Sequence, residues 1–166
     1  MIDPPAALPE VGERAPARGI VALRPPLGSE AVLTVVHRLM RGFTRGGIEA
    51  LEAIVTADVA ILGVPHGRGS LLDQWRTRLK NLSYGRLSAS EAVDDDKIER
   101  FTYEDLAVSG APERPPTMTP GELLVRFPVA TPRVGSEQLF GDEITLLLRR
   151  EGSTYKIAGF GEENGP

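Results

Sequence analysis

The stretch that decides the fold is TVVHRLMRGFTRGGIEALEAIVTADVAILGVP, residues 34–65. Starting just before it, apolar residues recur three and four positions apart, which is the spacing of one buried helical face. That face comprises Val32, Leu33, Val36, Leu39, Met40 and Phe43. Ser29 is the expected N-cap, and the Gly46–Gly47 pair is expected to end this first helix. A second helix is predicted over 48–56, and the β-rich run 58–64 predicts a strand.

The segment GVPHGRGSLLDQW, residues 63–75, predicts a turn from that strand into a third helix. Gly67 and Gly69 supply the backbone freedom that the turn needs, and Ser70 is the expected N-cap of the helix. Its apolar side carries Leu71, Leu72, Trp75 and Leu79. The first half of the domain is therefore expected to run helix, helix, strand, helix.

Beyond Asn81 the pattern changes from helices to strands. A long strand is expected over 84–93, whereas 94–110 allows either a short helix capped by Asp94 or an alternating strand. The prolines of 111–121 indicate a loop. Three further strands, the last two forming a hairpin, are expected side by side in an antiparallel sheet, at 121–130, 142–151 and 154–162.

Composition and charge limit the function classes. Apolar residues make up 41% and charged residues 25% of the 166 residues, which is ordinary for one globular domain. A net charge of −4 and an aromatic content of 5% argue against nucleic-acid binding. With no cysteine, the chain has no thiolate metal site and no cysteine nucleophile. No apolar run of membrane-spanning length occurs in the sequence.

The domain limits follow from the high Pro, Ala and Gly content of the start of the chain. Residues 1–27 are expected to form an extended tail or linker, residues 28–163 the domain, and residues 164–166 a C-terminal tail. A cytoplasmic location is expected for the chain as given. An exported or lipid-anchored location is expected instead if a leader has been trimmed from the N-terminus.

Residues 34–65, together with DEITLLLRREGSTYKIAGFGE (residues 142–162), resemble the nuclear transport factor 2-like superfamily, a cystatin-like fold that includes SnoaL-like polyketide cyclases and ketosteroid isomerases. The shared pattern is a helix ending in a Gly turn, a helix entering an Ala-Asp corner and a strand, and a closing hairpin. The resemblance extends over residues 29–162. It implies an α+β cone in which three N-terminal helices pack on a curved antiparallel sheet, with a pocket at the open end. It also implies a homodimer formed through the open sheet face.

Ketosteroid isomerases of this superfamily need a carboxylate base and hydrogen-bond donors for an enolate oxygen. On the resemblance, their tyrosine donor falls at Leu39, their aspartate base at Gly63 and their aspartic acid donor at Asp142. Only Asp142 retains a suitable side chain. The sequence therefore argues against steroid-type isomerisation.

Five polar or aromatic residues are the ligand-binding candidates: His66, Arg68, Trp75, Arg126 and Asp142. His66, at the expected pocket mouth, is either a general base or a loop residue before a helix. Arg68 lies between two glycines, either in an anion-binding turn or in solvent. The position of Trp75 on an apolar stripe favours core packing over ligand stacking. Arg126 faces either water or the interior of the cone.

No metal ion or cofactor is predicted. The two histidines, His37 and His66, lack the spacing of metal ligands, and the acidic run 94–97 lacks the alternation of an EF-hand loop. His37, in the middle of the first helix, is expected to be a half-exposed packing residue.

Two functions stay open at this point, beside a third, purely structural reading in which the open sheet face serves homodimerisation. The first is a cone domain that binds a small apolar molecule or a partner chain and lacks an intact isomerase acid-base set. The alternative is a SnoaL-like enzyme, a cyclase, isomerase or hydrolase acting on a small apolar substrate, with His66 and Asp142 as the catalytic candidates. Convergence of His66, Asp142 and Arg126 would favour the enzyme.

Overall fold

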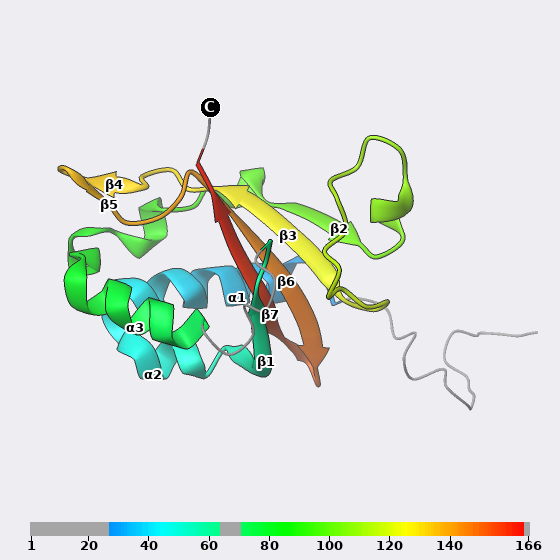
Figure 1. The fold of residues 1–166 in the computed structure, drawn as a ribbon, viewed down its shortest axis with the longest axis horizontal. Coiled ribbons are helices and arrows are strands. Elements are labelled where there is room, and N and C mark those ends of the chain that lie inside the picture. Colours follow the sequence, from blue (N-terminus) through cyan, green and yellow to red (C-terminus); the bar gives the residue numbers. More distant parts are fainter. Residues whose placement is uncertain (1–26, 64–70, 165–166) are drawn as a thin grey trace, which may run out of the picture.

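The computed structural model describes residues 27–63 and 71–164. The helical elements are α1 (Ser29–Arg41), the π-helical turn η3 (Gly42–Gly46), α2 (Gly47–Glu52) and α3 (Leu71–Asn81). The strands are β1 (Val55–Ile61), β2 (Glu99–Thr102), β3 (Leu123–Pro128), β4 (Arg133–Val134), β5 (Glu137–Gln138), β6 (Glu143–Glu151) and β7 (Thr154–Glu163). The domain is therefore α+β, as the sequence predicts, with the helices gathered on one side of the sheet (Figure 1). No helix in the described part of the chain is long and apolar enough to cross a membrane.

The main sheet has five strands in the order β1-β7-β6-β3-β2. The adjacency of β3, β6 and β7 and their antiparallel pairing confirm the prediction from the sequence. β1, however, pairs in parallel with β7, so the sheet is mixed and not wholly antiparallel. The sheet also stays open, with β1 and β2 as its edges, and does not close into a barrel.

The prediction of three full helices is only partly correct. α1 and α3 are helices of 13 and 11 residues, whereas α2 has only six. The helix expected over 48–56 ends early because the carbonyl of Ile54 already accepts a hydrogen bond of 2.8 Å from the N–H of Ile157 in β7. Pairing with the sheet thus overrides the local helical pattern. The chain does break where expected, at Gly47, whose φ of 79° is strained for a residue with a side chain.

The expected strand over 84–93 is wrong. Two short 3₁₀ turns, η4 (Tyr84–Arg86) and η5 (Ala89–Glu91), occupy this segment. Its buried residues, including Tyr84 and Ala92, pack into the helix-side core and not onto a neighbouring strand. Both readings of the next segment are realised, since the Asp94 side chain caps the 3₁₀ turn η6 (Asp95–Lys97) and β2 follows at Glu99.

The alternation of β6 divides the apolar residues between the two faces of the sheet. Ile144, Leu146 and Leu148 belong to the main core, which the helices cover. Leu147 belongs to a smaller cluster on the opposite face, together with Leu124, Ala158, Leu106 and Met118. The last two come from the long connection between β2 and β3, which therefore packs across part of the second face. We call this second face the open face of the sheet.

Candidate functional site

Three of the predicted site residues, Trp75, Arg126 and Asp142, lie in the described part of the chain. His66 and Arg68 lie outside the described residues, so whether His66, Asp142 and Arg126 converge stays untested. Asp142 directly precedes β6, and its carbonyl accepts a hydrogen bond of 2.9 Å from the N–H of Val129. His37 is half exposed, as expected, and its Nε2 lies 2.7 Å from Oδ1 of Asp95. Among the described residues no cluster of metal-ligating side chains occurs.

Trp75 is fully buried in the helix-side core. Its ring makes edge-on contacts with Phe43 and Phe160, at centroid distances of 5.3 and 5.1 Å. Phe43 in turn contacts Tyr84 and Phe140, so five aromatic rings pack together between the helices and the sheet. Aromatic side chains therefore fill this part of the space between the helices and the sheet.

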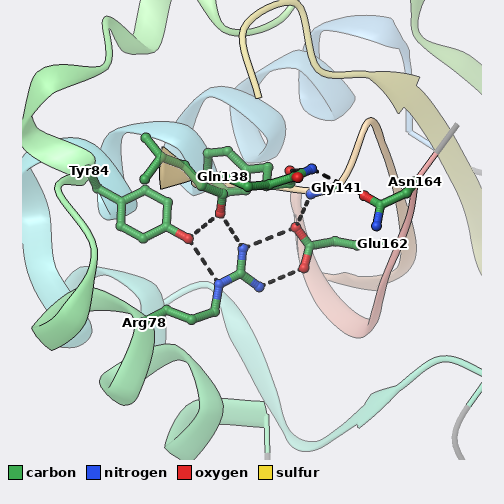
Figure 2. A network of polar contacts seen from close by, with 8 residues as sticks. Arg78, Tyr84, Gln138, Gly141, Glu162 and Asn164 are labelled. Atoms are coloured by element: carbon green, nitrogen blue, oxygen red, sulfur yellow. Dashed lines mark hydrogen bonds and ion pairs between the residues drawn. The ribbon is translucent and has the colours of Figure 1, made fainter. Parts of the chain in front are cut away.

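Arg78 forms a polar cluster at one end of this aromatic core (Figure 2). Its Nη1 and Nη2 donate to the two carboxylate oxygens of Glu162, at 2.6 and 3.0 Å. Nη2 also donates to the carbonyl of Leu139 at 2.7 Å, and Nε donates to the hydroxyl of Tyr84 at 2.9 Å. The Tyr84 hydroxyl donates to the same carbonyl, and the N–H of Gly141 donates to Glu162. The cluster thus joins α3, η4 and β7 to the segment that follows β5.

The polar groups of this cluster bond to one another and so hold the surrounding elements together. Burial raises the pKa of the Tyr84 phenol above its ordinary value, which keeps the hydroxyl protonated as a donor. The guanidinium of Arg78 already donates four hydrogen bonds within the protein. A hollow of about 350 Å³ lies beside the cluster, with Arg78 and Glu162 in its wall. Since their polar atoms are engaged with each other, a ligand there would have to break existing bonds.

A larger groove, of about 1050 Å³, lies on the open face of the sheet. One wall is the proline-rich segment 112–117 of the β2–β3 connection. The other comprises residues 60–63, which are the end of β1 and the two residues after it. Side chains of the sheet line the floor: Leu124 and Arg126 of β3, Glu143 and Thr145 of β6, and Glu163 of β7. We call this hollow the open-face groove. Its lining mixes apolar surface with a few charged groups, as in many ligand sites.

Register explains why these side chains share one face. Arg126 pairs with Thr145 across β3 and β6, and Glu143 pairs with Glu163 across β6 and β7. Residues directly opposite each other in a sheet point to the same side, so the four form two neighbouring rows. Arg126 lies 2.9 Å from Glu99 and 3.8 Å from Glu143, so its charge is already paired. Arg126 therefore lies on the open face, with its side chain 31% exposed, and not in the helix-side interior.

Arg114 is the other cation of the groove, and the sequence analysis missed it. Its guanidinium carbon lies 3.6 Å from the centroid of the Tyr103 ring, and Nη2 donates to the Tyr103 carbonyl at 2.7 Å. Its Nε is buried and has no hydrogen-bond partner among the described residues. The sequence of segment 111–121 indicates a loop and nothing more. That Arg114 lines a groove follows only from the packing of this loop on the sheet. Arg78, by contrast, had a signal, because it falls seven positions after Leu71 on the apolar side of α3.

No protein-family model matches the chain, and no curated protein matches it. Among solved structures, the chain is similar in fold to an uncharacterized protein with a cystatin-like fold from Caulobacter vibrioides, at 14% identity and a TM-score of 0.48, over 84% of this chain and 90% of that one. It is also similar to a chain named Rd1NTF2_05 that carries five substitutions, at 14% identity and a TM-score of 0.41, over 80% of this chain and 96% of that one. At these identities the likeness concerns the fold alone.

Proposed function

We propose that this chain is a binding domain that holds a small ligand, without catalysis, in the open-face groove. The observation that supports the proposal most is the size and lining of that groove. Small-molecule sites generally measure roughly 300–1,000 Å³ and combine an apolar lining with a few placed polar groups. The groove, at about 1050 Å³, is of this kind, with Leu62, Leu124 and three prolines beside Arg114, Arg126 and Glu143.

A binding function accounts for the lining better than a catalytic one. A general base needs a side chain held at hydrogen-bond distance from the proton that it removes. Asp142, the described candidate for acid-base chemistry, does not line the groove, and Arg126 is held by Glu99. The alternative, a SnoaL-like enzyme, depends on His66, which lies outside the described residues.

The experiment that tests the proposal is a thermal-shift screen of small molecules against the wild-type chain and a variant with a filled groove. Thr145 lies on the floor of the groove in β6 and is half buried. The variant Thr145→Tyr places a large ring there, so a ligand that raises the melting temperature of the wild type should no longer do so. Thr154→Tyr is the matched control, since Thr154 is exposed at the start of β7, away from the groove.

We expect binding to survive in Thr154→Tyr and to be lost in Thr145→Tyr. A ligand that stabilises both variants as it stabilises the wild type would place the binding site elsewhere and overturn the proposal. A folded Thr145→Tyr variant, judged by its circular dichroism spectrum, is a condition of the comparison. Thr145→Val, which keeps the size of the side chain, checks that the effect comes from filling the groove.

A further inference from the structure

We propose that Arg114 is the anchor for the carboxylate of the ligand, and that the open-face groove therefore selects small amphipathic monocarboxylates. The inference rests on the proposed function and names the ligand class of the same groove. Three features of the described residues carry it: the unpaired charge of Arg114, the way the side chain is held, and the composition of the rest of the lining.

Arg114 differs from three other arginines that this domain half buries. Arg78 is paired with Glu162, Arg126 with Glu99, and Arg149 with Glu122 and Asp58. Arg114 makes no ion pair with any described residue, and the hydrogen bond to Tyr103 uses only one of its five donors. A guanidinium without a carboxylate, in the wall of a ligand-sized groove, is a site for an incoming anion.

The side chain is also held in place before any ligand arrives. The Tyr103 ring lies under the guanidinium, and the Tyr103 carbonyl accepts from Nη2. Fixing a long side chain in advance reduces the entropy lost on binding. Nη1 donates to no described residue, so its two hydrogens are left for the oxygens of an incoming carboxylate.

The remaining lining restricts the kind of anion. Glu113, Glu143 and Glu163 line the same groove, so a ligand with several negative charges, such as a nucleotide, would be repelled. Leu62, Leu124 and the prolines at 112, 115 and 116 provide apolar surface for the rest of the ligand. One carboxylate on a compact apolar body fits both conditions.

The test uses three probes of one shape: 4-phenylbutyrate, its neutral amide 4-phenylbutyramide, and the cation 4-phenylbutylamine. Isothermal titration calorimetry measures each with the wild type, with Arg114→Gln, and with Arg100→Gln as the matched control. Arg100 is exposed on β2 and does not line the groove. We expect the carboxylate to bind at least tenfold more tightly than the amide, and Arg114→Gln to remove that difference while Arg100→Gln keeps it.

A second measurement needs no variant. The buried Nε–H of Arg114 should give a protected signal in a ¹⁵N-correlated spectrum, and 4-phenylbutyrate should shift that signal whereas the amide should not. Two results would overturn the Arg114 inference: equal binding of amide and carboxylate, or unchanged carboxylate binding in Arg114→Gln. The proposed function would still stand if Thr145→Tyr abolished binding. No binding of any of the three probes would also overturn the inference alone. Binding that persists in Thr145→Tyr would overturn the proposed function together with the inference.

Discussion

The buried carboxylate of Glu122 accepts a hydrogen bond of 2.9 Å from Nε of Arg149, which lies across the sheet on β6. Glu122 is 4% exposed, and its other oxygen accepts a hydrogen bond of 2.8 Å from the N–H of Thr119. Arg149 reaches further, to Asp58 on β1, at 3.0 Å. This ion-pair network fastens the end of the β2–β3 connection to the open face, and so it holds one wall of the groove in position.

Replacing Arg149 with leucine should therefore destabilise the domain. The substitution leaves the carboxylate of Glu122 buried and without its cation, which we expect to lower the free energy of unfolding by about 2 kcal/mol, a reduced figure because Arg149 itself is partly exposed. Urea unfolding followed by circular dichroism measures the change. The double variant Arg149→Leu, Glu122→Leu should recover part of the loss, and a double variant less stable than the single one would contradict this account.

Asp58 gives the same network a pH dependence. The neighbouring Thr56 side chain and the hydrogen bond from Arg149 lower the pKa of Asp58 from its ordinary value of 3.8. A lowered pKa means that the folded state favours the carboxylate, so this stabilisation is present above pH 3.8 and is lost as the pH falls through the folded-state pKa. Urea unfolding at a series of pH values below about 5 should show a shallower loss of stability in Asp58→Asn than in the wild type. Parallel curves for the two proteins would show that Asp58 does not contribute.

Substitutions in the Arg78 cluster should lower the free energy of unfolding, and most when they leave a charge unpaired. Tyr84→Phe removes one hydroxyl and should cost about 1–2 kcal/mol, whereas Glu162→Gln leaves the largely buried Arg78 without its carboxylate and should cost about 2–3 kcal/mol. Chemical unfolding ranks the two variants. Glu163→Gln is the matched control, since Glu163 is exposed and lies on the opposite face, and it should change stability by less than about 0.5 kcal/mol. The reverse ranking would show that the cluster is held mainly by packing.

Gly159 allows Leu62 to lie close over β7, beside the groove. A Cβ at this position would lie 2.7 Å from Cδ2 of Leu62 and 3.1 Å from Cβ of Leu147. We expect Gly159→Ala to lower stability by about 1–3 kcal/mol through overpacking, and Leu62→Ala added to it to restore part of that loss. Gly28→Ala, where a Cβ meets nothing within 4 Å, is the control and should have little effect. Thermal unfolding of the wild type and the three variants measures these changes. An unchanged melting temperature in Gly159→Ala would mean that Leu62 moves freely.

Much of the fold follows from periodicity in the sequence. The apolar stripe of α1 predicts that helix, because it places its residues on one buried face. The β-rich runs and the turn between the last two predict β3, β6 and β7. The errors occur where a tertiary contact decides the local structure. Ile54 would extend a helix by its spacing, but its carbonyl bonds to Ile157 in a strand about one hundred residues later.

The candidate site was less predictable, because it is built by contacts between distant parts of the chain. The groove exists only because segment 112–117 packs back over the sheet, and loop sequences carry little information about where a loop lies. The alternation around Arg126 indicates that its side chain and those of Val125 and Phe127 point to opposite faces of the sheet. It does not indicate that a loop partly covers the face of Arg126. His66 attracts interest as one of two histidines, and its role stays a prediction.

β7 lies between β1 and β6 in the sheet, and this position has a consequence for the order of folding. β1 is held in the sheet by β7 alone, and β7 is the last strand of the described chain, some ninety residues further on. While the chain is being synthesised, the apolar surfaces of α1 and β1 therefore wait for a partner that arrives last. Such long-range pairing slows folding and leaves these surfaces open to aggregation. A nascent chain halted before Thr154 is thus expected to require chaperone protection, because β1 joins the sheet only once β7 has emerged from the ribosome.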